Sequence, residues 1–297
     1  MRGYTHALSG ASGWLAVTSP SLVGLGWHET SPSIALAGTV LCAGAAMLPD
    51  MDHPSGTIAW SLPSVKIGGM TVIPSPTRLV CAGVAAVSGG HRHGTHCFVG
   101  MGVFTGLAWL ATLWTVTIHG RSIALGCGLI AVLLVAFASK SLGLSGRIAR
   151  AGRSTGLMGA TVAKVLRSWV GSWVLALSTA GTVTWMLEYR WEWLPLAVAI
   201  GCFLHCAGDS LTPQGVPWLW PLNPKPPKLL RKAPVIGWLV NLAWQSNGYF
   251  RLPLIGKTDT AEDRNPREML LAAVFVCHIF YLLAYQVGLM TGRYVLP

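Results

Sequence analysis

Residues 97–118 read CFVGMGVFTGLAWLATLWTVTI, an apolar run without a charged residue. A helix needs about 20 such residues to cross the hydrocarbon core of a bilayer. Similar runs at 122–139, 169–187 and 270–290 each predict a further membrane-spanning helix. These stretches predict an all-α fold, a polytopic transmembrane helical bundle.

Shorter apolar segments add to this bundle. Segment 194–209 is shorter but apolar, and 11–26 and 34–49 are also short and rich in Gly and Ala, so whether these two cross the bilayer stays open. Segment 79–90 is too short to cross and suggests a re-entrant or interfacial helix, and 235–245 suggests an interfacial helix. We therefore expect about five to seven membrane segments.

The amino-acid composition also indicates that lipid covers much of the protein surface. The 297 residues are 52% hydrophobic and 10% charged, with a mean hydropathy of +0.54, whereas a soluble domain carries about 25% charged residues. The net charge of +11 indicates topology signals and contacts to anionic lipid headgroups rather than to nucleic acid. The seven cysteines form no CxxC pair and are typical of buried, reduced thiols.

Basic residues predict the orientation. The connection 140–168 carries Lys and Arg without any acid, and the stretch 212–268 is also rich in both. The positive-inside rule places these two regions in the cytoplasm. The start of 97–118 and the end of 194–209 then lie at the cytoplasmic face of the inner membrane.

This orientation suggests a division of the chain. Residues 1–221 would form the membrane-embedded core, including the basic connection 140–168. Residues 222–297 would form a basic cytoplasmic segment followed by a C-terminal transmembrane helix. The oligomeric state stays open.

Two acids and a histidine follow the apolar segment 34–49 in LPDMDHP, namely Asp50, Asp52 and His53. Acids directly after an apolar helix are costly unless they are solvated, paired or bound to a cation. A metal site and a solvated loop that caps the helix end are both open here.

A second polar cluster, HRHGTH, holds His91, His93 and His96 within six residues of a chain with nine histidines. Neutral imidazole is the commonest metal ligand in proteins. Arg92 could clamp an anionic oxygen, because its guanidinium fork matches phosphate and carboxylate groups. The alternative is a polar loop at the membrane edge.

The third cluster pairs His205 with Asp209 at the end of an apolar segment. A spacing of four places both on one face of a helix, where they can reach one ion. A structural His–Asp pair is the alternative. His6 joins them only because the predicted topology brings it to the same face.

The order THxxxG, LPDxDHP, HRxxTH and HxxxDxxTPxGVxxxWP between residues 5 and 221 resembles the YdjM-like family of membrane-bound metal-dependent hydrolases. The His and Asp pattern is also similar to the zinc-dependent phospholipase C and P1 nuclease group. The resemblance implies a divalent metal and hydrolase activity. Its ligand candidates are His6, Asp50, Asp52, His53, His91, His96, His205 and Asp209.

These candidates are more numerous than the ligands of one tetrahedral ion. We therefore expect one to three bound ions, with zinc as the first choice and otherwise manganese or iron. The leading hypothesis is hydrolysis of a phosphoester or lipid-linked substrate by a metal-activated water. Arg92 would hold an oxyanion, and Asp52 or Asp209 would act as base. The alternatives are a metal-ion or proton transporter and a non-catalytic scaffold with a structural metal.

Overall fold

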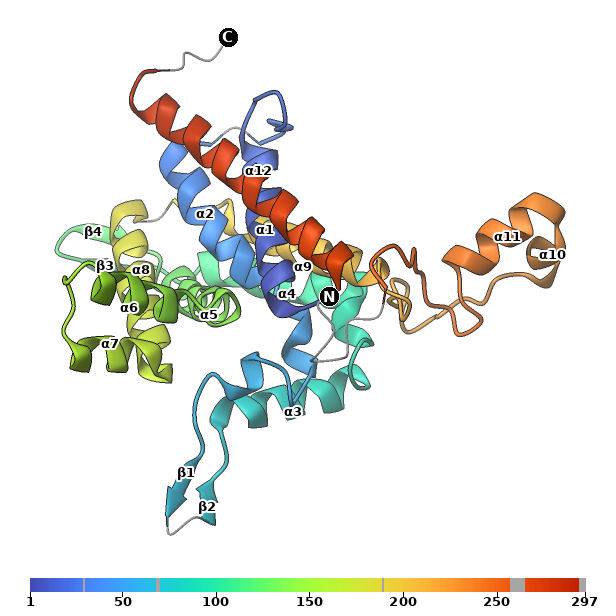
Figure 1. The fold of residues 1–297 in the computed structure, drawn as a ribbon, viewed down its shortest axis with the longest axis horizontal. Coiled ribbons are helices and arrows are strands. Elements are labelled where there is room, and N and C mark those ends of the chain that lie inside the picture. The colour runs from blue at the N-terminus through green and yellow to red at the C-terminus, as the bar shows by residue number, and fades with distance from the viewer. Residues whose placement is uncertain (29, 68–69, 189, 257–264, 294–297) are drawn as a thin grey trace.

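The computed structural model describes residues 1–28, 30–67, 70–188, 190–256 and 265–293, and these ranges contain twelve α-helices (Figure 1). The helices are α1 (Gly3–Thr18), α2 (Pro32–Ala45), α3 (Pro76–Ser88), α4 (Phe98–Thr112), α5 (Leu125–Leu142), α6 (Leu144–Ser154), α7 (Ala160–Arg167), α8 (Trp169–Leu187), α9 (Leu194–Ser210), α10 (Lys228–Lys232), α11 (Pro234–Ala243) and α12 (Pro266–Met290). The shorter elements are the 3-10 turns η1 (Pro49–Asp52), η2 (Ile58–Trp60) and η3 (Gly94–His96), and the strands β1 (Val65–Ile67), β2 (Met70–Ile73), β3 (Val116–Ile118) and β4 (Arg121–Ile123).

The predicted all-α membrane fold is confirmed. Among the residues that the structure describes, four segments are long and apolar enough to cross a bilayer: Pro32–Asp52, Leu125–Leu142, Val170–Leu187 and Pro266–Met290. Shorter apolar helices accompany them at α3, α4, α9 and α11. Part of the basic stretch 212–268, residues 257–264, lies outside the described residues.

The segment expected at 11–26 forms its helix eight residues earlier, as α1 (Gly3–Thr18). Pro20 explains where the helix ends, because the residue before a proline is driven out of the helical region. Ser19 accordingly has extended angles, with φ −113° and ψ 108°. The earlier start matters for function, because it places His6 on a helix.

The run 97–118 is helical only as far as Thr112, where α4 ends. The β-branched residues that follow form β3, which pairs antiparallel with β4. His119 and Gly120 connect the strands with φ angles of 49° and 74°. Two positive φ angles are what a two-residue hairpin turn needs, so local turn chemistry outweighs the apolar pattern here.

The centre of the bundle is formed by α1, α2, α5 and α9. Helix α1 packs against α2, α9 and α12, and α2 packs in turn against α5 and α9; Figure 1 shows α12, α1 and α2 side by side. Small residues permit this close packing, as is usual between membrane helices. A Cβ on Gly10 would lie 2.5 Å from the carbonyl oxygen of Cys42, and one on Gly44 would overlap that of Leu134.

Gly44→Ala is therefore expected to lower the free energy of unfolding by about 1–3 kcal/mol, because α2 and α5 must move apart. Gly102→Ala on α4 is the matched control. A Cβ at Gly102 meets nothing within 4 Å. Because alanine has a higher helix propensity than glycine, this variant should have an unchanged free energy of unfolding or one raised by about 1 kcal/mol. Thermal unfolding of the purified variants in detergent measures both, and equal unfolding temperatures would contradict the close α2–α5 contact.

A buried acid ties the C-terminal helix to α1. Glu268 is only 1% exposed, and its Oε1 accepts hydrogen bonds from the Arg2 amide (2.6 Å) and the Thr5 hydroxyl (3.0 Å). These bonds fix the first turn of α1, directly beside His6. In the sequence, Glu268 is one acid in a mixed-charge stretch, and nothing local distinguishes it.

Candidate metal centre

The predicted site residues lie at one end of the helical bundle, where α1 and α4 begin and α2 and α9 end. His6 lies in the first turns of α1, Asp50 and Asp52 follow α2 in η1, and His205 lies near the end of α9. His96 directly precedes Cys97, the N-cap of α4. The structure thus brings together clusters that are separated by up to two hundred residues in the chain.

Two groups of side chains within this centre have spacings that could hold a metal ion. One consists of His6, His205 and Asp209, all buried, and the other of Asp50, His91 and His96. In each group the ligand atoms lie within 4.8 Å of one another.

The two groups meet where His96 and His205 face each other. Their Nε2 atoms are 3.2 Å apart. Asp50 Oδ1 lies 3.9 Å from His96 Nε2 and 3.6 Å from His205 Nε2, and Asp209 Oδ2 lies 3.8 Å from both nitrogens. Ligand atoms about 2.0–2.1 Å from a tetrahedral zinc ion are themselves about 3.3 Å apart, so these spacings fit a shared ion.

The Nδ1 partners of the two imidazoles support the same fit. His205 Nδ1 lies 2.6 Å from the backbone oxygen of Ala46 and must donate to it. His96 Nδ1 faces Asp52 Oδ2 at 3.2 Å and the Thr95 hydroxyl oxygen at 3.0 Å. Because each Nδ1 faces an oxygen acceptor, the two Nε2 atoms are left facing each other 3.2 Å apart, and an ion between them could be bound by both rings.

Asp52 is fully buried and organises the loop around it. Its Oδ1 accepts from His91 Nδ1 (2.8 Å), and its Oδ2 accepts from the Thr95 hydroxyl (2.5 Å) and the Arg92 amide (3.0 Å) as well as from His96. A carboxylate that binds Nδ1–H fixes the ring and directs Nε2 toward a metal. These contacts support a positioning role for Asp52.

Asp209 is surrounded by positive groups and N–H donors. Its Oδ1 contacts the Met1 amine at 2.5 Å and His6 Nε2 at 3.2 Å, and its Oδ2 contacts the Arg92 guanidinium at 2.9 Å. The His6 ring stacks on His205 with centroids 3.8 Å apart. His6 Nδ1 is buried without a partner, so the centre contains a free nitrogen lone pair.

Arg92 adopts a left-handed backbone conformation, with φ 59°. This is uncommon for a residue other than glycine and costs about 1–3 kcal/mol. It allows the amide to face Asp52 while the guanidinium reaches Asp209 and, at 3.3 Å, the Thr212 hydroxyl. The Arg92 Nε atom is buried without a partner.

Two histidines of the predicted clusters lie at the periphery. The His53 ring packs edge-on against His91, with centroids 4.5 Å apart, and belongs to neither ligand group. His93 Nε2 lies 3.2 Å from the Tyr249 hydroxyl. A metal-ligand role for His53 stays a prediction.

Sequence reasoning missed Tyr249, whose hydroxyl also lies 3.3 Å from the Arg92 carbonyl oxygen. Burial raises the pKa of this phenol, and the nearby Arg92 partly opposes the shift. Tyr249 reaches the loop because its neighbour Phe250 pairs with Val216 in an isolated antiparallel bridge. No motif around Tyr249 signals this contact.

The fold and the site together define a class, a helical membrane protein with a buried His/Asp centre at one end of its bundle. The chain belongs to the YdjM inner membrane protein family, whose model matches residues 1–143 and 157–290. No curated protein and no solved structure matches it, so the similarity to the phospholipase C and P1 nuclease group is not shown. The match continues well past residue 221, where the sequence motifs end, and so includes α12.

Proposed function

We propose that this protein is a membrane-bound metal-dependent hydrolase that acts on a phosphoester of a lipid or lipid-linked substrate. The observation that carries the proposal is the spacing of Asp50, His96, His205 and Asp209, which fits a shared divalent ion. Such an ion supplies Lewis acidity and lowers the pKa of a water to about 7. Zinc suits this mixed imidazole and carboxylate set, ahead of manganese or iron.

The openness of the centre supports catalysis over a purely structural metal. Structural zinc sites are closed, whereas catalytic sites keep one position open. Asp50 is 27% exposed and His91 is 37% exposed, although Asp52, His96 and His205 are completely buried. The centre is thus closed on the α9 side and open beside Asp50 and His91.

The side chains divide the remaining work. Arg92 binds a phosphoryl oxygen, because its buried Nε donor has no other partner and guanidinium matches phosphate geometry. Asp50 would bind the ion through Oδ1, and its second carboxylate oxygen would take the proton of the attacking water and return it to solvent, because Asp50 is the most exposed of the three aspartates at the centre. Asp52 holds His91 and His96 rather than acting as the base.

The clustering of the histidines and aspartates argues against a transporter. A transport path needs polar groups at several depths of the membrane. The eight candidate ligands instead gather at one end of α1, α2, α4 and α9. By the distribution of Lys and Arg, we place this end at the cytoplasmic face.

The test begins with metal content. The full chain is purified in detergent, and bound metal is counted by inductively coupled plasma mass spectrometry before and after chelation. Release of phosphate or of a headgroup from phosphatidic acid, a diacyl phospholipid and an isoprenyl diphosphate is then assayed. We expect one to three equivalents of metal and hydrolysis of one substrate, lost on chelation and restored by added ion.

Two results would overturn the proposal. The first is folded protein that takes up no metal even when ions are added. The second is metal-loaded protein whose phosphoester hydrolysis is unaffected by chelation that removes all of the metal.

A further inference from the structure

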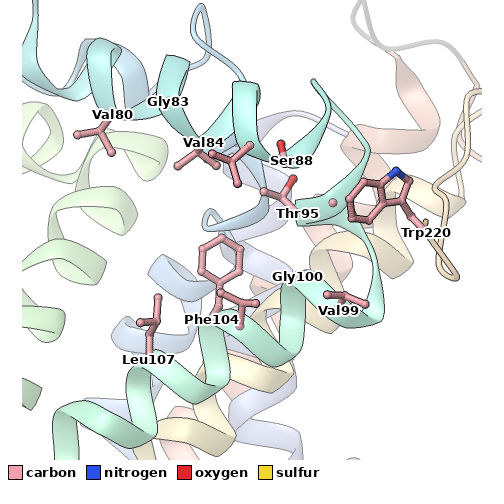
Figure 2. A pocket seen from close by; sticks show the side chains of 13 residues that line it. Val80, Gly83, Val84, Ser88, Thr95, Val99, Gly100, Phe104, Leu107 and Trp220 are labelled. Carbon is pink, nitrogen blue, oxygen red and sulfur yellow. The ribbon is translucent and has the colours of Figure 1, made fainter.

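A long apolar groove lies between α3 and α4, with a volume of about 490 Å³ (Figure 2). Val80 and Val84 line it from α3, and Val103 and Leu107 line it from α4. Trp220 stands at one end. Apart from the hydroxyls of Ser88 and Thr95, the side chains along the groove are hydrocarbon, aromatic or absent.

A glycine on the α3 wall leaves part of the groove open. A Cβ on Gly83 would meet nothing within 4 Å, so open space remains beside it. Val80, Val103 and Leu107 are each more than half exposed at its edges. Apolar surface of this kind is unfavourable in water and needs a hydrocarbon neighbour.

The groove adjoins the candidate metal centre at Thr95, which forms a wall shared by both. Thr95 lines the groove, and its hydroxyl also donates to Asp52, which holds His91 and His96. From there the groove follows α4 from Val99 to Leu107, which corresponds to about 12 Å of helix. A single ligand that fills both places needs an anionic group at one end and a hydrocarbon chain at the other.

We propose that the groove receives one hydrocarbon chain of the lipid substrate while its phosphoester lies at the metal centre. This inference rests on the proposed function and narrows the substrate to a phosphoester with a long acyl or isoprenyl chain. A groove of this volume lies within the usual range for ligand pockets, about 300–1,000 Å³. Because the walls of the groove are mainly apolar, we expect it to select substrates by the length of their hydrocarbon chain.

The position of α3 favours a lipid as the occupant. The helix is apolar but too short to span, and it packs mainly on η1 and η2, beyond the end of α2. In Figure 1 it runs across the direction of α2 and α12. A short apolar helix set across the bundle in this way suits the membrane interface, from which a lipid chain could enter the groove laterally.

The test uses the full chain in vesicles that contain a phospholipid with a photoreactive diazirine on one acyl chain. After irradiation, the labelled residues are mapped by peptide mass spectrometry. We expect labelling to concentrate on 80–87 and 99–107. Gly83→Phe, which fills the groove, should reduce that labelling about tenfold.

Gly102→Phe is the matched control, because Gly102 lies on the exposed part of α4 outside the groove and has open space around its Cβ position. It should leave the labelling unchanged. Labelling spread evenly over all lipid-facing helices, or equal labelling of the Gly83→Phe variant, would overturn the groove as a chain site.

A second measurement separates this inference from the proposed function. Hydrolysis of long-chain and short-chain phosphoesters is compared, and Gly83→Phe should slow only the long-chain reaction. Equal slowing of both would overturn the role in substrate selection. If the groove is labelled but no phosphoester is cleaved by metal-loaded protein, the proposed function fails and the groove stands only as a lipid-chain site.

Discussion

Replacement of His205 by alanine is expected to abolish stoichiometric metal binding and, with it, hydrolysis. His205 Nε2 lies within 4 Å of His96 Nε2, Asp50 Oδ1 and Asp209 Oδ2, so it shares with His96 the central position among the candidate ligands. Loss of an outer-shell partner typically costs 10–100-fold in metal affinity, and loss of a central ligand should cost about 1,000-fold or more. Metal content per chain and titration with a chromophoric chelator measure this change.

The matched control is His119→Asn. His119 lies in the turn between β3 and β4, outside both ligand groups, and asparagine tolerates its positive φ. The control should keep its full metal content. Because His205→Ala also removes the donor to the Ala46 carbonyl, a loss of stability of about 1–3 kcal/mol is expected, and circular dichroism must show that the variant is folded. A folded His205→Ala protein with normal metal content would remove His205 from the centre.

Much of the fold could be predicted from apolar length alone. The segment 169–187 forms α8 with the same bounds, and 194–209 forms α9 with one added residue. The errors arise where short-range chemistry competes with apolarity, as at the proline that ends α1 and the hairpin that shortens 97–118. These signals were present in the sequence, at Pro20 and at His119-Gly120.

The clustering of these side chains could also be predicted, but the contacts among them could not. Charge-based topology brought His6, Asp50, His96 and His205 to one face, and the structure places them in two adjoining groups that could hold a metal ion, while their role as ligands stays a prediction. That Asp52 holds two histidines across about forty residues of chain depends on how the loop before η3 packs on η1. Tyr249 and Glu268 act through similar long-range contacts, which composition and spacing do not encode.

Asp52→Asn should separate a residue that positions ligands from one that binds the ion. Both oxygens of Asp52 accept hydrogen bonds, from His91 on one side and from Arg92, Thr95 and His96 on the other. Asparagine turns one acceptor into a donor and must disrupt at least one of these bonds. We expect a fall in metal affinity of about 10–100-fold, as for other outer-shell carboxylates.

The two variants are distinguished by comparing the affinity for metal with the number of ions bound per chain at saturation. If Asp52 only directs the Nε2 atoms of His91 and His96, its asparagine variant should bind the full complement of metal when the ion is saturating. His205→Ala should stay substoichiometric at the same concentration, because a ligand is missing. Thr95→Val, which removes one donor to Asp52, should shift the affinity in the same direction but less. If folded Asp52→Asn protein cannot be saturated, Asp52 is itself a ligand and not only a residue that positions His91 and His96.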